Sequence, residues 1–161
     1  MPNPSYDPAN RVLAAARELG LDESSFHQPP GFRARAVIER VLGRFTKQGG
    51  EGDRGCWLWR DLREPHLFLP EPQDLQVLFA LGPPTTPVWL LVEDFGRTKS
   101  GPPFWLFEAN LASTVATLGN HHLIEFYVVS RQIDWLVGEN HHDIMFAAGD
   151  HAIAALQGIN R

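Results

Sequence analysis

Residues 123–148, LIEFYVVSRQIDWLVGENHHDIMFAA, contain three strand-like runs joined by short connections. The runs are 123–129, 133–137 and 144–148, and each is predominantly apolar. Parallel neighbours would need a crossover of about a dozen residues or more, whereas antiparallel neighbours can be joined by a few. This stretch therefore predicts a three-strand antiparallel meander near the C-terminal end of the chain.

Side chains in the first run alternate between the two faces of the predicted sheet. Ile124, Phe126 and Val128 share one face, and we expect this set to face the core. The opposite face carries Leu123, Glu125, Tyr127 and Val129. The alternation therefore predicts one core face for this strand.

The rest of the chain carries both helix and strand signals. The strongest helical period covers 34–45, where apolar residues recur every three or four positions. Further helices are expected at 8–19, 72–81 and 110–118 and in a final helix capped by Asp150, and further strands at 56–62, 67–69, 88–93 and 104–107. We expect a single α+β domain over 1–161, with a helical N-terminal part (1–47) and a sheet-containing part (56–161). Its helices should pack on a mainly antiparallel sheet of about five or six strands that includes the C-terminal meander.

Composition excludes several classes of protein. The chain has 161 residues, 43% of them hydrophobic, and a net charge of −5, which fits a folded globular domain and argues against nucleic acid or an anionic membrane as a partner. Cys56 is the single cysteine, so no intramolecular disulfide can form and a cytoplasmic location is expected. The uncharged run 75–92 is interrupted by glycine and prolines, so no membrane span is predicted.

Histidines are the unusual feature of this composition. The chain has seven, and four of them form two adjacent pairs. One pair lies in the segment GENHHD, residues 138–143, between the last two predicted strands. Imidazole and carboxylate groups are good ligands for zinc or iron, and the meander would bring the start of its first strand near this segment. The candidate binding residues are His121, His122, Glu139, Asn140, His141, His142 and Asp143.

Two interpretations of this cluster remain open. It could be a metal or acid/base site, or a turn held by hydrogen bonds from Asn and Asp to their own backbone. Adjacent histidines in an extended backbone point to opposite faces, so a single pair seldom supplies two ligands to one ion. No catalytic residue and no cofactor are predicted. The loop GRTKSG, residues 96–101, lacks the glycine before lysine that a phosphate-binding loop requires, and no nucleophile elbow occurs.

A basic segment stands out in this acidic chain. Between positions 31 and 47 there are five basic residues and one acidic residue, so the segment carries +4 and the remainder −9. Arg33, Arg40 and Arg44 fall near one side of the predicted helix, away from its apolar stripe. This pattern is typical either of a solvated surface paired with nearby acidic residues or of a docking surface for an acidic protein, with RNA as a less favoured partner.

Two stretches, FWLFEANLASTV (104–115) and FYVVSRQIDWLVGENHHD (126–143), resemble a family of small bacterial proteins classed only as a domain of unknown function. The resemblance implies a bacterial cytosolic protein and transfers no catalytic residues. A looser similarity, of size and layout, is to bacterial toxin-immunity proteins. We therefore expect a non-enzymatic protein-binding module of the immunity or antitoxin kind. One alternative is a metal-assisted hydrolase that uses the two histidine pairs. Another is a small-ligand pocket lined by Trp105, Tyr127 and Trp135.

Overall fold

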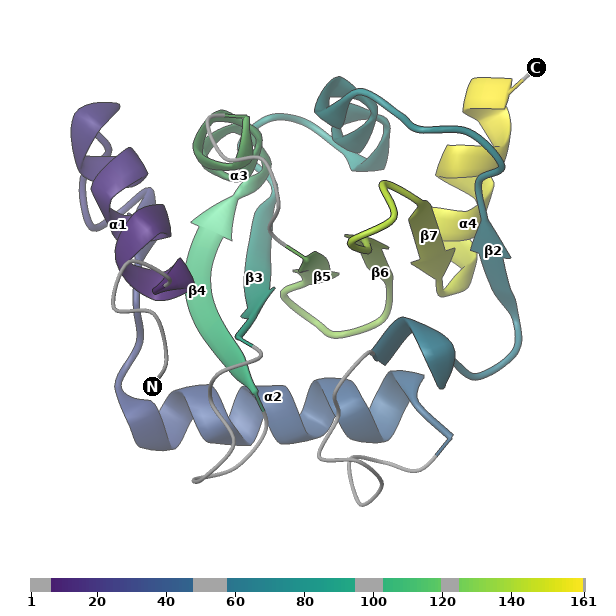
Figure 1. Cartoon of the computed structure of the whole chain (residues 1–161), viewed down its shortest axis with the longest axis horizontal. Helices are drawn as coiled ribbons and strands as arrows, with labels where there is room; N and C mark the ends of the chain where they lie inside the picture. Colours follow the sequence, from purple (N-terminus) through teal and green to yellow (C-terminus); the bar gives the residue numbers. More distant parts are fainter. Residues whose placement is uncertain (1–6, 48–57, 95–102, 120–124, 161) are drawn as a thin grey trace.

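The fold is a single sheet with helices on both faces (Figure 1). The computed structural model describes residues 7–47, 58–94, 103–119 and 125–160. Within these residues seven strands form the sheet in the order β1-β4-β3-β5-β6-β7-β2, and every neighbouring pair is antiparallel. The predicted α+β class is confirmed, with a somewhat larger sheet than expected.

The elements have the following bounds. The α-helices are α1 (Pro8–Glu18), α2 (Gly31–Phe45), α3 (Leu111–Leu118) and α4 (Asp150–Gln157), and short 3-10 helices are η1 (Leu58–Arg60), η2 (Leu75–Leu81) and η3 (Gly158–Asn160). The strands are β1 (Phe26–His27), β2 (His66–Phe68), β3 (Pro87–Glu93), β4 (Phe104–Asn110), β5 (Phe126–Ser130), β6 (Leu136–Glu139) and β7 (Met145–Ala148). The N-terminal part predicted as helical thus also contributes β1 to one edge of the sheet.

The C-terminal meander is confirmed as β5, β6 and β7. Tyr127 pairs with Gly138, and Gly138 pairs with Phe146 on the other side. A Cβ atom on Gly138 would lie 2.6 Å from Cζ of Phe146 and 2.7 Å from the carbonyl oxygen of Phe126. The glycine in the middle of β6 therefore allows the ring of Phe146 to cross the strand.

The prediction of one core face for β5 is wrong, because helices bury both faces of the sheet. Phe126 and Val128 belong to the core cluster shared with α1, α3 and α4. Tyr127 and Val129 belong to a second cluster, which is completed by α2 and η1. In Figure 1, α2 runs along one side of the sheet while α1, α3 and α4 lie on the other. A strand covered on both sides needs no polar face.

Two sequence predictions of element type need correction. The described part of the expected strand 56–62 is a 3-10 turn, η1, followed by an isolated bridge between Leu62 and Thr46. This turn lets both Leu58 and Leu62 pack in the cluster beneath α2. The expected helix over 72–81 is confined to η2, which Asp74 caps by accepting a hydrogen bond from the N–H of Gln76 at 2.8 Å.

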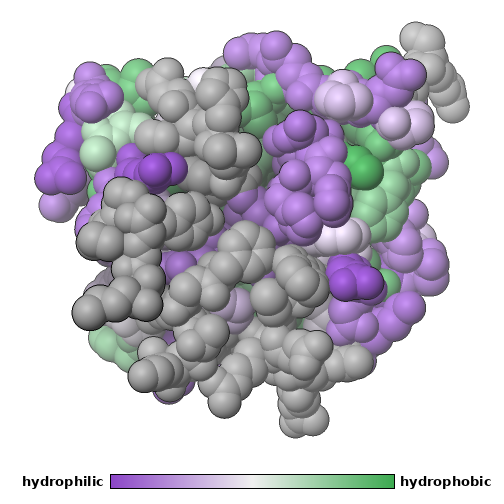
Figure 2. Space-filling model, viewed as in Figure 1, coloured by the Kyte–Doolittle hydropathy of each residue, from purple (hydrophilic) through white to green (hydrophobic). Residues whose placement is uncertain are grey.

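The outer surface is predominantly polar on the side shown in Figure 2. Hydrophilic residues cover most of its described area, and hydrophobic residues show in smaller areas between them. None of the helices in the described part of the chain combines the length and the apolar character needed to cross a membrane. A large apolar side chain that is exposed on this surface is therefore a candidate contact point for a partner.

Candidate functional site

The turn between β6 and β7 is organised by Asn140. Its buried side-chain oxygen accepts hydrogen bonds from the N–H groups of His142, at 2.9 Å, and Ile144, at 3.2 Å. The N–H of Asp143 donates to the carbonyl of Asn140 at 3.0 Å, and Asp143 has a φ of 59°. Asn140 thus has a structural role, because its side chain holds this segment in a tight turn. The sequence pattern alone is also compatible with an extended backbone here.

The side chain of His141 extends from this turn toward a buried carboxylate. Its Nδ1 lies 3.1 Å from Oε2 of Glu125, whose side chain is completely buried, while the His141 side chain is 41% exposed. Where Glu125 is ionised, its carboxylate can only accept a hydrogen bond, so Nδ1 of His141 is the donor. A buried carboxylate therefore orients the ring of a histidine at the surface.

Tyr127 extends the hydrogen-bonded chain into the sheet. Its hydroxyl donates to Oε1 of Glu125 at 3.0 Å and lies 3.4 Å from Oε2 of Glu93, which is also buried. Burial, followed by the charges of Glu93 and Glu125, raises the pKa of Tyr127 well above its ordinary value. The hydroxyl therefore stays protonated and remains a donor between two carboxylates on adjacent strands.

The rings of His141 and His142 lie together, with centroids 4.0 Å apart. Both make edge contacts with Trp59, at centroid distances of 6.0 and 6.1 Å. Adjacent histidines point to opposite faces only where the backbone is extended, and here the backbone turns. The two imidazole rings therefore pack against each other and against Trp59.

The remaining candidate residues of this region behave differently. Glu139 lies at the end of β6, and burial, followed by the charge of Asp143, raises the pKa of Glu139 above its ordinary value. His121 and His122 lie outside the described residues, so the predicted approach of the two histidine pairs stays a prediction. Within the described ranges no group of three or more His, Cys, Asp or Glu side chains is arranged to hold a metal ion.

Sequence reasoning named the turn and missed the residues behind it. The sequence pattern places Glu125 and Tyr127 on one face of a strand and Glu93 at the end of another strand, and it names no contact among the three. The available signal was a glutamate inside the otherwise apolar run LIEFYVV. A charged residue in such a run needs a specific partner once both faces of the sheet are covered.

The basic helix forms a second candidate surface. Arg33 pairs with Glu108 at 3.7 Å, which fits the interpretation of a paired surface. Arg40 and Arg44 are exposed and make no ion pair with any residue that the structure describes. Phe32 precedes them on α2 and is 82% exposed, the largest exposure among the described large apolar side chains.

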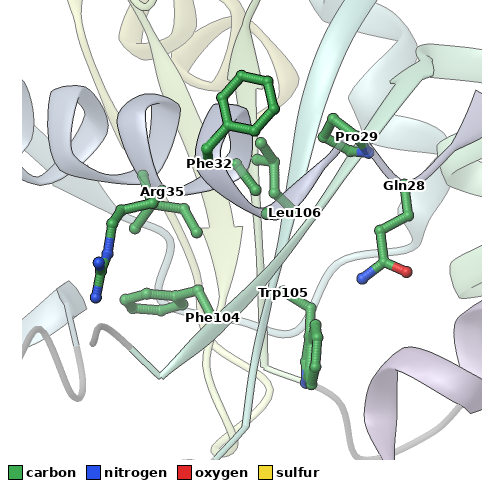
Figure 3. Close-up of a pocket in the computed structure, with 10 residues that line it drawn as sticks. Gln28, Pro29, Phe32, Arg35, Phe104, Trp105 and Leu106 are labelled. Atoms are coloured by element: carbon green, nitrogen blue, oxygen red, sulfur yellow. The ribbon is translucent and has the colours of Figure 1, made fainter. Parts of the chain in front are cut away.

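A groove of about 720 Å³ lies beside Phe32, between the N-terminal half of α2 and β4. Figure 3 shows Phe32 and Arg35 projecting from α2, with Phe104 and Trp105 on the strand side of the groove. Trp105 is held by its indole N–H, which donates to Oδ2 of Asp94 at 2.9 Å. A proposed small-ligand pocket shared by Trp105, Tyr127 and Trp135 is excluded, because Tyr127 and Trp135 belong to the clusters on opposite faces of the sheet.

Comparison with known proteins assigns the chain to one family. The chain belongs to a family of unknown function, DUF6756, whose model matches residues 10–160. The resemblance to an uncharacterised family is thereby confirmed, and it covers nearly the whole chain instead of its C-terminal part alone. No curated protein and no solved structure matches the chain.

Proposed function

We propose that this protein is a protein-binding module that docks an acidic partner on the exposed side of α2. The observation that carries the proposal is Phe32, which is 82% exposed at the edge of the α2–β4 groove and immediately precedes Arg33 in the sequence. An exposed aromatic ring costs free energy in water, and aromatic and arginine side chains dominate the binding energy of many protein interfaces.

Charge supports an acidic partner. The segment 31–47 carries +4 within a chain of −5, so this surface attracts anionic groups whereas the rest of the molecule repels them. Arg40 and Arg44 have no acidic partner among the described residues, and Arg44 packs its guanidinium over the ring of Phe45 at 5.3 Å. A partner segment that combines carboxylates with an apolar side chain would pair with the arginines and fill the groove.

We extend the proposal to a non-enzymatic, cytoplasmic protein of bacteria that neutralises a toxin by binding it. The loose similarity to immunity proteins and the lack of a complete catalytic signature in the sequence support this extension. The hydrolase alternative depends on His121 and His122 and stays a hypothesis.

Peptide binding tests the docking surface directly. Fluorescence anisotropy would compare the full chain with two peptides matched in length and apolar content, one rich in Asp and Glu and one rich in Lys. We expect the acidic peptide to bind and its affinity to fall as salt rises. Phe32→Ser and Arg40→Glu should each weaken binding about tenfold or more.

Arg17→Glu is the matched control. It makes the same charge change at an exposed position of α1, whose buried residues pack on the opposite face of the sheet. We expect this variant to bind the acidic peptide nearly as well as the parent chain. Equal binding of the two peptides, or equal weakening by Arg17→Glu and Arg40→Glu, would contradict a docking surface on α2.

A further inference from the structure

We propose, on the basis of the docking function above, that the acidic partner of α2 binds as an amphipathic helix. The helix lies along the outer line of α2, which we define as the exposed residues Phe32, Ala36 and Gly43. Its backbone comes closest to α2 at Gly43. The partner segment is therefore identified by its secondary structure as well as by its charge.

The outer line follows the helical period. Phe32, Ala36 and Gly43 lie within about 40° of one another around the axis of α2, because successive residues of an α-helix turn by about 100°. All three are exposed, and together they span roughly 16 Å of the helix. The side chains of a second helix also repeat every three or four positions, so they can pack along such a line.

Gly43 marks the point of closest approach. Glycine within a helix lowers stability relative to alanine, so its presence there needs a reason. The fold supplies none, because a Cβ atom at Gly43 would meet no atom of the described residues within 4 Å and the residue lies within the α-helix without a positive φ. Glycine and alanine on an exposed helix surface allow the backbone of another molecule to approach closely.

The charges beside the outer line match an acidic helix. Arg35 flanks the line on one side and Arg40 on the other. Carboxylates on both sides of a partner helix would face these arginines, while its apolar stripe packs over Ala36 and against the ring of Phe32. Glu39 also faces outward near the middle of the line, so the partner residue opposite it is neutral or basic.

This surface fits a helix better than an extended segment. An added strand needs backbone N–H and C=O groups to pair with, and an α-helix such as α2 uses its own internally. The neighbouring strand β4 is closed to an added strand, because Phe104 and Leu106 on the wall of the groove are each 1% exposed. A second copy of the chain is disfavoured by charge, since two segments of +4 would meet.

Two acidic peptides of identical composition test the helical partner. Apolar residues recur every three or four positions in one peptide and at every second position in the other. In fluorescence anisotropy with the full chain, the peptide with the helical period should bind about tenfold more tightly or better, and circular dichroism should show helix gained on binding. Equal affinities that Phe32→Ser and Arg40→Glu still weaken would leave the docking surface in place and overturn the helical partner. Binding of neither peptide would overturn both proposals.

Gly43→Gln tests the point of closest approach, with Ala154→Gln as the matched control. Glutamine is uncharged and favours helix, so the Gly43 variant should fold at least as stably as the parent chain, as thermal denaturation would show. Its longer side chain should hold the partner away and weaken binding of the helical-period peptide about tenfold or more. Ala154 is exposed on α4, which packs on the opposite face of the sheet, so Ala154→Gln should bind like the parent.

The proposal is wrong if Gly43→Gln binds the helical-period peptide as tightly as Ala154→Gln does. It is also wrong if the chain alone dimerises in analytical ultracentrifugation and Gly43→Gln prevents the dimer, because the outer line would then be occupied by a second copy.

Discussion

Replacing Gly43 by alanine should stabilise the fold. Gly43 lies on the exposed side of α2, near its C-terminal end, and a Cβ atom built there meets no other atom within 4 Å. Alanine in place of glycine within a helix raises the free energy of unfolding by roughly 0.5–1 kcal/mol, because alanine restricts the unfolded chain and adds no unfavourable contact to the helix. For a domain of this size that corresponds to a rise in melting temperature of roughly 1–4 °C.

Urea denaturation followed by circular dichroism measures this change, with Gly138→Ala as the contrasting variant. At Gly138 an added methyl group would overlap the ring of Phe146 and the carbonyl of Phe126, so we expect a loss of about 1–3 kcal/mol or more. Opposite signs for the two alanine variants support the described geometry. If Gly43→Ala destabilises the protein, the assignment of an open, solvent-facing helix at this position is refuted.

Three further substitutions test the interior. Tyr127→Phe removes the hydroxyl that donates to buried Glu125 and should cost about 1–3 kcal/mol in chemical denaturation; an unchanged midpoint would contradict the hydrogen-bonded chain. Glu139→Gln should stabilise the protein at pH 7. The pKa of Glu139 is raised in the folded protein, so the parent chain loses stability as the pH rises through that pKa, whereas the variant does not. Below the ordinary glutamate pKa of 4.5 the substitution should bring no gain, and stability curves at several pH values would show this. Thr114→Val should gain about 1 kcal/mol in urea denaturation, since the buried Thr114 hydroxyl has no hydrogen-bond partner among the described residues; a loss would show that the hydroxyl is satisfied.

The fold was predictable where one physical signal was strong. The apolar period over 34–45 gave α2, and the short connections after residue 123 gave the antiparallel meander. The stretch 56–62 was misread because a run that is apolar on both sides fits a buried strand and a buried turn equally well. Coverage of both sheet faces was missed because alternation along one strand does not show what packs on either side.

The candidate site was predictable in place but not in chemistry. Histidine and carboxylate residues in GENHHD pointed to the β6–β7 turn. The partner of His141 could not be found from spacing, because Glu125 approaches it through the pairing of Phe126 with Glu139 across β5 and β6. Backbone conformation at Asn140 decided the rest, since the same two histidines in an extended chain would point apart.

Stability alone does not explain the polar chain from Glu93 through Tyr127 and Glu125 to His141. Two carboxylates are buried in the sheet, and removing such groups from water costs several kcal/mol that hydrogen bonds only partly recover. Apolar side chains of similar volume would fill the same space at lower cost. His141, whose side chain is 41% exposed, is the member of this chain that reaches the surface. The buried carboxylate holds a surface imidazole in one orientation, and this positioning is what the polar chain provides beyond stability.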